Sequence, residues 1–106
     1  MRNEIIIDKM LGYASRVIGY CADCTFESFS ADTKTVEACV FNLSQIGELC
    51  HMADETFTAA HPEIPWHEMY GLRNRIVHDY DGVNLLLVWQ IIREDLPELI
   101  KLLQAV

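Results

Sequence analysis

The chain has 106 residues, a length that predicts a single domain with one modest hydrophobic core. Hydrophobic residues make up 51% of the sequence and aromatic residues only 9%. This aliphatic content favours helices packed on helices, and its surplus in so small a protein suggests a buried subunit interface. The formal net charge of −8 argues against a protein that coats nucleic acids, because an acidic surface repels phosphates.

The N-terminal half carries two helical patterns. Apolar residues from Ile7 to Cys21 recur at intervals of three and four, which predicts a first helix over about residues 3–20. We expect "TFESF" to form a short turn whose two phenylalanines plug the end of the bundle. Asp32 is a suitable N-cap for a second long helix, whose apolar stripe runs from Val36 to Cys50. This helix is expected to continue, with or without a break, through "ADETFTAA".

The N-terminal stretch and the cysteines indicate the compartment. No apolar run is long enough for a signal-peptide core or approaches the roughly 20 residues that span a bilayer. We therefore expect a cytosolic protein with no membrane partner and with reduced thiols. Cys21 and Cys24 have the spacing of half a zinc site or a redox pair, but no second ligand pair follows, so no metal or cofactor is expected. Cys39 and Cys50 fall on the apolar stripe and should be core residues.

The stretch "HPEIPW" is the one clear loop in the middle of the chain, because each of its two prolines disfavours helical geometry in the preceding residue. Pro65 suits the first turn of a third long helix, predicted over about residues 65–78. Asp81-Gly82 should end this helix.

The last helix is predicted to start at an Asn84 cap and to bury a stripe from Val88 to Leu103. Pro97 should kink or restart it. No strand pattern, repeat or low-complexity segment is present. The expected fold is therefore all-α, a single domain over residues 1–106 built as an antiparallel bundle of four to five helices with short connections.

The end of the third predicted helix carries the motif "RNRIVHDY", which gathers Arg73, Asn74, Arg75, His78 and Tyr80 within about two turns. At roughly 100° per residue, Arg73 and Tyr80 lie about 20° apart, whereas His78 lies about 140° from Arg73. Either the helix is distorted near its end, or a second copy of the chain completes the site. The apolar residues of this helix, Met69, Leu72 and Ile76, should pack inward.

These residue types suit phosphoryl chemistry. A guanidinium such as that of Arg73 can stabilise charge that develops on a phosphoryl centre, and an imidazole such as that of His78 can take and return a proton near neutral pH. RNA supplies its own nucleophile, the 2′-OH, so these two side chains are sufficient for strand cleavage without a metal ion. Asn74 could bond His78 or the phosphate, Arg75 could assist in substrate binding, and Tyr80 could position the substrate.

Other interpretations of the motif stay open. Arg73 could pair with Glu68 or Asp79, with His78 bonding a last carbonyl, as at many helix ends. A metal-dependent nuclease would need several convergent carboxylates, and Asp79 and Asp81 point apart. The isolated glycines do not form a phosphate-binding loop. Further residues of interest are His51, His61 and His67, expected on the surface or in loops, Trp66 and Trp89, expected as core or interface aromatics, and Arg93, which could reach a partner's site.

The motif resembles that of HEPN-domain proteins, an Arg followed by a polar residue and then by a His four to six positions after the Arg. In particular it resembles their HepT-like toxin branch, in which a Tyr follows two residues after the His. The flanks agree, from "HPEIPWHEMYGLRNRIVHDYDGVNLLLVWQIIREDLPEL" back to "TKTVEACVFNLSQIGELC" in the second predicted helix. The similarity spans about Ile7 to Leu103.

The resemblance implies a helical bundle that dimerises with the motif helices facing each other, so that Arg73 and His78 from the two chains form a composite cleft that cuts RNA without metal. It implies Asn74 as the polar accessory residue, and Tyr80 as the target of a small nucleotidyltransferase antitoxin of the MntA type, which transfers AMP from ATP. A negatively charged AMP beside the motif would oppose binding of the substrate phosphate. The alternative function is a non-catalytic nucleotide-binding or scaffold subunit of a two-component nucleotidyltransferase.

Overall fold

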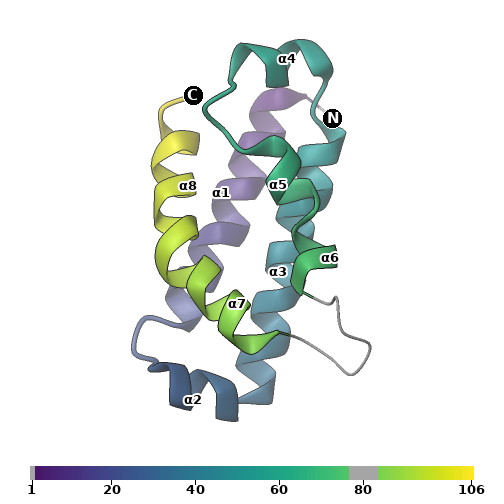
Figure 1. Cartoon of the computed structure of the whole chain (residues 1–106). Helices are drawn as coiled ribbons and strands as arrows, with labels where there is room; N and C mark the ends of the chain where they lie inside the picture. Colours follow the sequence, from purple (N-terminus) through teal and green to yellow (C-terminus); the bar gives the residue numbers. More distant parts are fainter. Residues whose placement is uncertain (1, 77–83) are drawn as a thin grey trace.

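The computed structural model describes residues 2–76 and 84–106, and in these two stretches the chain is helical without a β-strand (Figure 1). The helices are α1 (Asn3–Tyr20), α2 (Phe26–Ala31), α3 (Thr33–Met52), α4 (Glu55–Ala60), α5 (Trp66–Tyr70), α6 (Leu72–Ile76), α7 (Leu85–Gln90), a π-helical turn η1 (Ile91–Asp95) and α8 (Leu96–Gln104). None of these helices is both long and apolar enough to cross a lipid bilayer. The all-α prediction is confirmed.

The two long helices α1 and α3 run antiparallel and form the centre of the bundle (Figure 1). Helix α8 packs along α1, whereas α5 and α6 pack along α3. The apolar stripes predicted from the sequence meet between these helices, and Met10, Ala14, Leu43 and Leu96 are fully buried. The core thus holds α6, which carries the first part of the motif, against α3.

Helix starts follow the predicted caps. The side chain of Asp32 accepts a hydrogen bond from the backbone N–H of Thr35 at 3.3 Å, and that of Asn84 accepts one from the backbone N–H of Leu87 at 3.1 Å. Each of these bonds satisfies an N–H that the first helical turn leaves without a partner. The second long helix continues toward "ADETFTAA" with a break at residues 53–54, and α4 begins immediately after it.

The prediction of a turn at "TFESF" was wrong, because this segment begins the helix α2. Thr25 and Ser28 form a reciprocal capping box, in which each side chain accepts from the other residue's backbone N–H, at 3.1 and 3.0 Å. The predicted plug is present: Phe29 is fully buried, and the rings of Phe26 and Phe29 lie 6.2 and 5.2 Å from that of Trp89. Trp89 is therefore a partly buried aromatic that packs against the core at this end of the bundle.

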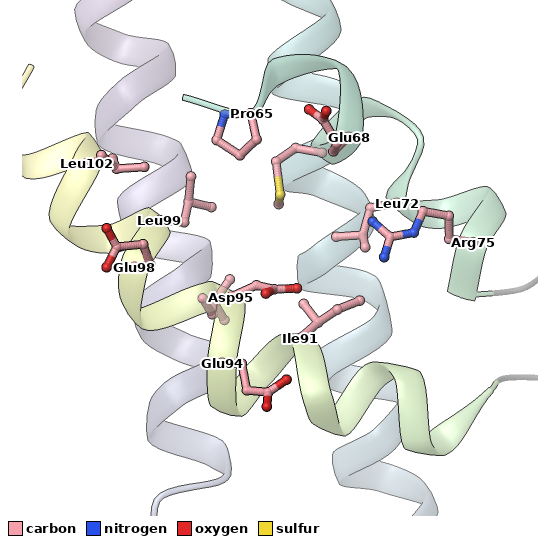
Figure 2. Close-up of a pocket in the computed structure, with 12 residues that line it drawn as sticks. Pro65, Glu68, Leu72, Arg75, Ile91, Glu94, Asp95, Glu98, Leu99 and Leu102 are labelled. Atoms are coloured by element: carbon pink, nitrogen blue, oxygen red, sulfur yellow. The ribbon is translucent and has the colours of Figure 1, made fainter. Parts of the chain in front are cut away.

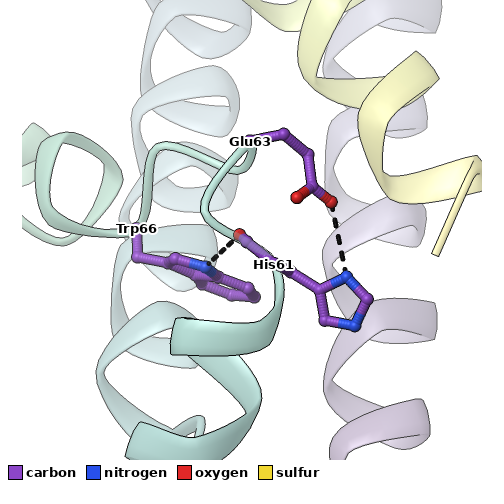
Figure 3. Close-up of polar contacts among 3 residues, drawn as sticks. All are labelled: His61, Glu63 and Trp66. Atoms are coloured by element: carbon purple, nitrogen blue, oxygen red, sulfur yellow. Dashed lines mark hydrogen bonds and ion pairs between the residues drawn. The ribbon is translucent and has the colours of Figure 1, made fainter.

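The loop before α5 is fixed by its own polar contacts (Figure 3). The indole N–H of Trp66 donates to the backbone carbonyl of His61 at 2.9 Å, and the His61 ring pairs with the Glu63 carboxylate at 3.3 Å. Ile64 between them is buried. These contacts set where α5 starts, and α5 leads directly into the motif helix.

The predicted single helix over residues 65–78 is instead interrupted at Gly71, between α5 and α6, and residues 77 and 78 lie outside the described residues. Gly71 keeps helical backbone angles and donates to the His67 carbonyl at 3.0 Å. The interruption lies beside a close approach to α3, because a Cβ atom built on Gly47 would lie 2.7 Å from the Met69 carbonyl oxygen. A close contact between the backbones of α3 and α5 therefore lies next to the interruption at Gly71.

Replacing Gly47 with alanine should therefore destabilise the protein. A backbone carbonyl cannot move aside as a side chain does, so α5 must shift, and overpacking of this kind costs about 1 to 3 kcal/mol. Urea unfolding followed by circular dichroism measures the effect. The matched control is Gly12→Ala in α1, where the added Cβ meets nothing within 4 Å and the change should be neutral or stabilising by up to about 1 kcal/mol. Equal stabilities of the two variants would contradict the close contact.

The last predicted helix is not restarted at Pro97: it runs without a break from α7 through η1 into α8, and its turn before Pro97 is altered. The backbone N–H of Leu96 donates to the Ile91 carbonyl, five residues back, so this turn is π-helical. Proline lacks an N–H and its ring crowds the carbonyl four residues earlier, and a wide turn before Pro97 accommodates both. Pro97 then lies in the first turn of α8.

Candidate active site on the motif helix

Helix α6 positions the first three candidate residues. Leu72 and Ile76 are buried, as predicted, whereas Arg73, Asn74 and Arg75 between them are exposed. At about 100° per residue, Asn74 points directly away from the core, and the two arginines leave the helix on opposite flanks, roughly 160° apart. Arg73 and Arg75 therefore do not share one face of the helix.

The other candidate residues lie outside the described residues. These are His78 and Tyr80, together with the acidic residues Asp79 and Asp81 considered as ion-pair partners or metal ligands. Their roles stay predictions.

The ion pair proposed between Arg73 and Glu68 is not formed. The described residues contain two ion pairs, Arg2 with Glu4 at 3.2 Å and His61 with Glu63 at 3.3 Å. In this part of the chain, therefore, no carboxylate lies within 4 Å of the Arg73 guanidinium. Asp79, the other partner considered for Arg73, lies outside the described residues. A guanidinium presents a planar array of donors that can bind an anion.

Arg75 lines a groove on the opposite flank, where α5 and α6 face η1 and α8 (Figure 2). The groove has a volume of about 390 Å³. Four acidic side chains line it, from Glu68 on one wall to Glu94, Asp95 and Glu98 on the other.

An aromatic pair lies just before the motif. The rings of His51 on α3 and Tyr70 at the end of α5 stack with centroids 4.4 Å apart and planes inclined by 11°. Both residues are exposed, and Tyr70 precedes Arg73 by three positions. Sequence reasoning missed this pair, because its members are distant in the chain and no local pattern links them.

Arg93 is engaged within its own chain. Its guanidinium donates to the Cys24 carbonyl at 3.0 Å and lies over the Trp89 ring, 4.6 Å from the centroid. These contacts join η1 to the loop after α1 and give Arg93 a role within its own chain. A reach of Arg93 toward a partner's site stays a prediction.

The four cysteines are free thiols, and three of them are buried. The Sγ atoms of Cys21 and Cys39 lie 3.6 Å apart, and burial raises the pKa of both thiols. Burial also raises the pKa of Cys50 to about 12. These three side chains are therefore neutral near pH 7 and pack as small apolar groups. Across residues 2–76 and 84–106, no group of three or more His, Cys, Asp and Glu side chains is placed to hold a metal ion.

Comparison with known proteins gives consistent matches. The family described as ribonuclease HepT-like matches residues 10–106. A Thermococcus cleftensis protein named "Probable ribonuclease HepT" is 38% identical over 80 residues, which cover 76% of this chain and 73% of that protein. The Methanocaldococcus jannaschii protein named "Putative RNase MJ1380" is 33% identical over 97 residues, which cover 92% and 89% of the two chains. No solved structure gave a significant match.

The matched region contains α3, the loop before α5, the motif and the last helices, which are the segments that build and support the candidate site. The helical fold of the described residues and a sequence similarity that covers residues 10–106 therefore agree, and the chain belongs to the HepT-like ribonuclease family.

Proposed function

We propose that this protein is a metal-independent endoribonuclease. The observation that carries the proposal is the combination of family membership with an exposed Arg73 that has no carboxylate partner among the described residues. A guanidinium in this state can bind phosphate bidentately. The rest of the chain is acidic and repels the phosphates of nucleic acids. We therefore expect the substrate to be a specific stretch of RNA rather than nucleic acid in general.

The proposed reaction is transesterification within the RNA strand. His78 accepts the proton of the 2′-OH, whose oxygen attacks the neighbouring phosphorus, and Arg73 stabilises the charge on the five-coordinate phosphoryl centre. The bond from phosphorus to the 5′-oxygen then breaks, and that oxygen takes a proton from an imidazolium. The products are a 2′,3′-cyclic phosphate and a 5′-OH end, and no redox change or external nucleophile is required.

The proposed site is completed by a second copy of the chain. On an ideal helix His78 would diverge from Arg73 by about 140°, which favours a site built from two chains over one built from a single chain. Large apolar side chains are exposed on elements that pack against or lead into α6: Phe41 on α3 is 58% exposed, Leu86 on α7 is 53% exposed and Tyr70 on α5 is 46% exposed. Exposed apolar side chains on these neighbouring elements support a dimer interface close to α6.

The proposal includes control by a nucleotidyltransferase antitoxin in the cytoplasm, acting on Tyr80. Transfer of AMP to the Tyr80 hydroxyl would place a phosphate and a nucleoside two residues from His78. The added negative charge competes with the substrate phosphate for Arg73, and the added bulk excludes the RNA strand.

The direct test is incubation of the purified protein with RNA in the presence of excess EDTA. We expect cleavage that persists with the chelator and leaves cyclic phosphate ends, measured by gel electrophoresis and end-group analysis. Cleavage that requires an added divalent cation would contradict the metal-independent mechanism. Absence of cleavage on all RNAs tested, with retained nucleotide binding, would instead favour the scaffold-subunit function.

A further inference from the structure

The groove beside Arg75 is built by two helical stripes that face each other (Figure 2). The first, on α5 and α6, comprises Pro65, Glu68, Met69, Leu72 and Arg75. The second, on η1 and α8, comprises Ile91, Glu94, Asp95, Leu96, Glu98, Leu99 and Leu102. Residues spaced by three and four positions share one face of a helix, so each wall presents a continuous row of side chains.

The two rows give the groove an apolar floor and an acidic rim. Met69, Leu72, Ile91 and Leu99 are buried and form the floor, and Leu102 extends it. The exposed carboxylates of Glu68, Glu94, Asp95 and Glu98 stand around it, against the single guanidinium of Arg75. A volume of about 390 Å³ is within the usual range for binding sites of roughly 300 to 1,000 Å³.

The rim carboxylates are not neutralised by the described part of the chain. Both ion pairs found there, Arg2 with Glu4 and His61 with Glu63, lie outside the groove. The acids are spread along three helices, Glu68 on α5, two on η1 and Glu98 on α8. Several separate negative charges around an apolar floor attract a ligand that carries several separate positive charges.

We propose that this groove docks a cationic amphipathic helix of a partner protein. Such a helix places aliphatic residues at intervals of three and four on the floor, and its flanking Lys and Arg side chains reach the rim carboxylates. A second copy of this chain would have to present a basic helical stripe to the groove, and its 8 Lys and Arg residues are outnumbered by 16 Asp and Glu residues.

A helix docked in the groove would affect α6, because α6 forms part of the groove wall and carries the first residues of the motif. Arg75 on the groove wall and Arg73 of the candidate active site belong to the same five-residue helix α6. A helix bound in the groove lies against α6 and holds it in place or shifts it. This consequence rests on the proposed function, whereas the docking itself does not.

The test uses a fluorescein-labelled synthetic peptide made of leucine and lysine, with a sequence that places the leucines on one face of the helix. Its binding to the protein is measured by a fluorescence anisotropy titration without RNA. We expect the paired substitution Glu94→Lys and Glu98→Lys to weaken binding about tenfold or more. The matched control, Glu27→Lys and Glu55→Lys, makes the same change in net charge at two exposed positions outside the groove and should change the affinity less than about twofold. A second peptide with serine in place of leucine should bind about tenfold more weakly or not at all.

Equal losses in the two charge-reversal variants would overturn the proposal, because attraction would then be general to the acidic surface. Binding of the serine peptide as tightly as the leucine peptide, or no binding of either, would overturn it as well. Sedimentation of the unliganded variants provides an independent check: a change of oligomeric state with the groove substitutions would assign the groove to contact between copies. Because these measurements contain no RNA, a failure of docking and a failure of nuclease activity are separable.

Discussion

Substitution of Arg73 by alanine is expected to lower kcat/KM for RNA cleavage by about 100- to 1,000-fold, the effect of removing one preorganised stabiliser of a developing charge. Substitution of His78 by alanine should lower it by about 100- to 10,000-fold, because the proton of the 2′-OH then has no positioned acceptor. Both rates are measured with the same RNA under the same chelating conditions. The two losses should not add in the double variant, because the residues act on one transition state.

Matched variants separate catalysis from charge and folding. Lys34→Ala removes an exposed positive charge at the start of α3 and should leave cleavage within about twofold of the wild type. Arg73 is exposed, so Arg73→Ala should unfold at a urea concentration close to that of the parent protein. If Lys34→Ala and Arg73→Ala lowered the cleavage rate equally, the Arg73 guanidinium would act through the overall electrostatic field of the protein and not at the reacting phosphate.

Substitution of Tyr80 by phenylalanine should separate activity from its control. The variant keeps the ring but lacks the hydroxyl that would accept AMP, so it should cleave RNA at close to the wild-type rate in the presence of the nucleotidyltransferase and ATP. The wild-type protein should lose nearly all activity under the same conditions and gain the mass of one or more AMP units. Cleavage assays and intact mass spectrometry, run in parallel, measure the two effects.

Complete silencing of Tyr80→Phe by the same partner, without a mass change, would show that inhibition acts by occlusion instead of modification. A catalytic rate that falls strongly without any partner present would assign the hydroxyl of Tyr80 to the reaction itself.

Local signals in the sequence predicted most of the fold. The caps at Asp32 and Asn84 and the apolar stripes of the long helices are short-range patterns, and the structure has helices at the predicted positions. Helix α2 was missed because six residues are too few to show a helical period, although Thr25 and Ser28 carried its capping signal. The close approach of α3 at Gly47, beside the interruption at Gly71, was missed because the two glycines are distant in the chain.

The candidate site was predictable only in part for the same reason. Motif spacing and helical geometry predicted which side chains of α6 face inward and which face solvent. They did not predict that Arg75 joins a groove with Glu94 and Glu98, or that Tyr70 stacks on His51, because those neighbours come from helices distant in sequence. Such contacts depend on how the helices pack, which no local pattern encodes.

The most direct test of the account uses hybrid dimers that combine one Arg73→Ala chain with one His78→Ala chain, isolated through two different affinity tags. If the arginine of one chain and the histidine of the other act together on one phosphate, each hybrid has one intact site and one site that lacks both groups. The account predicts that hybrids recover about half of the wild-type rate of chelator-resistant RNA cleavage, while either variant alone is nearly inactive. Hybrids no more active than the separate variants would contradict the composite site, and a wild-type protein that cuts no RNA would contradict the proposed function as a whole.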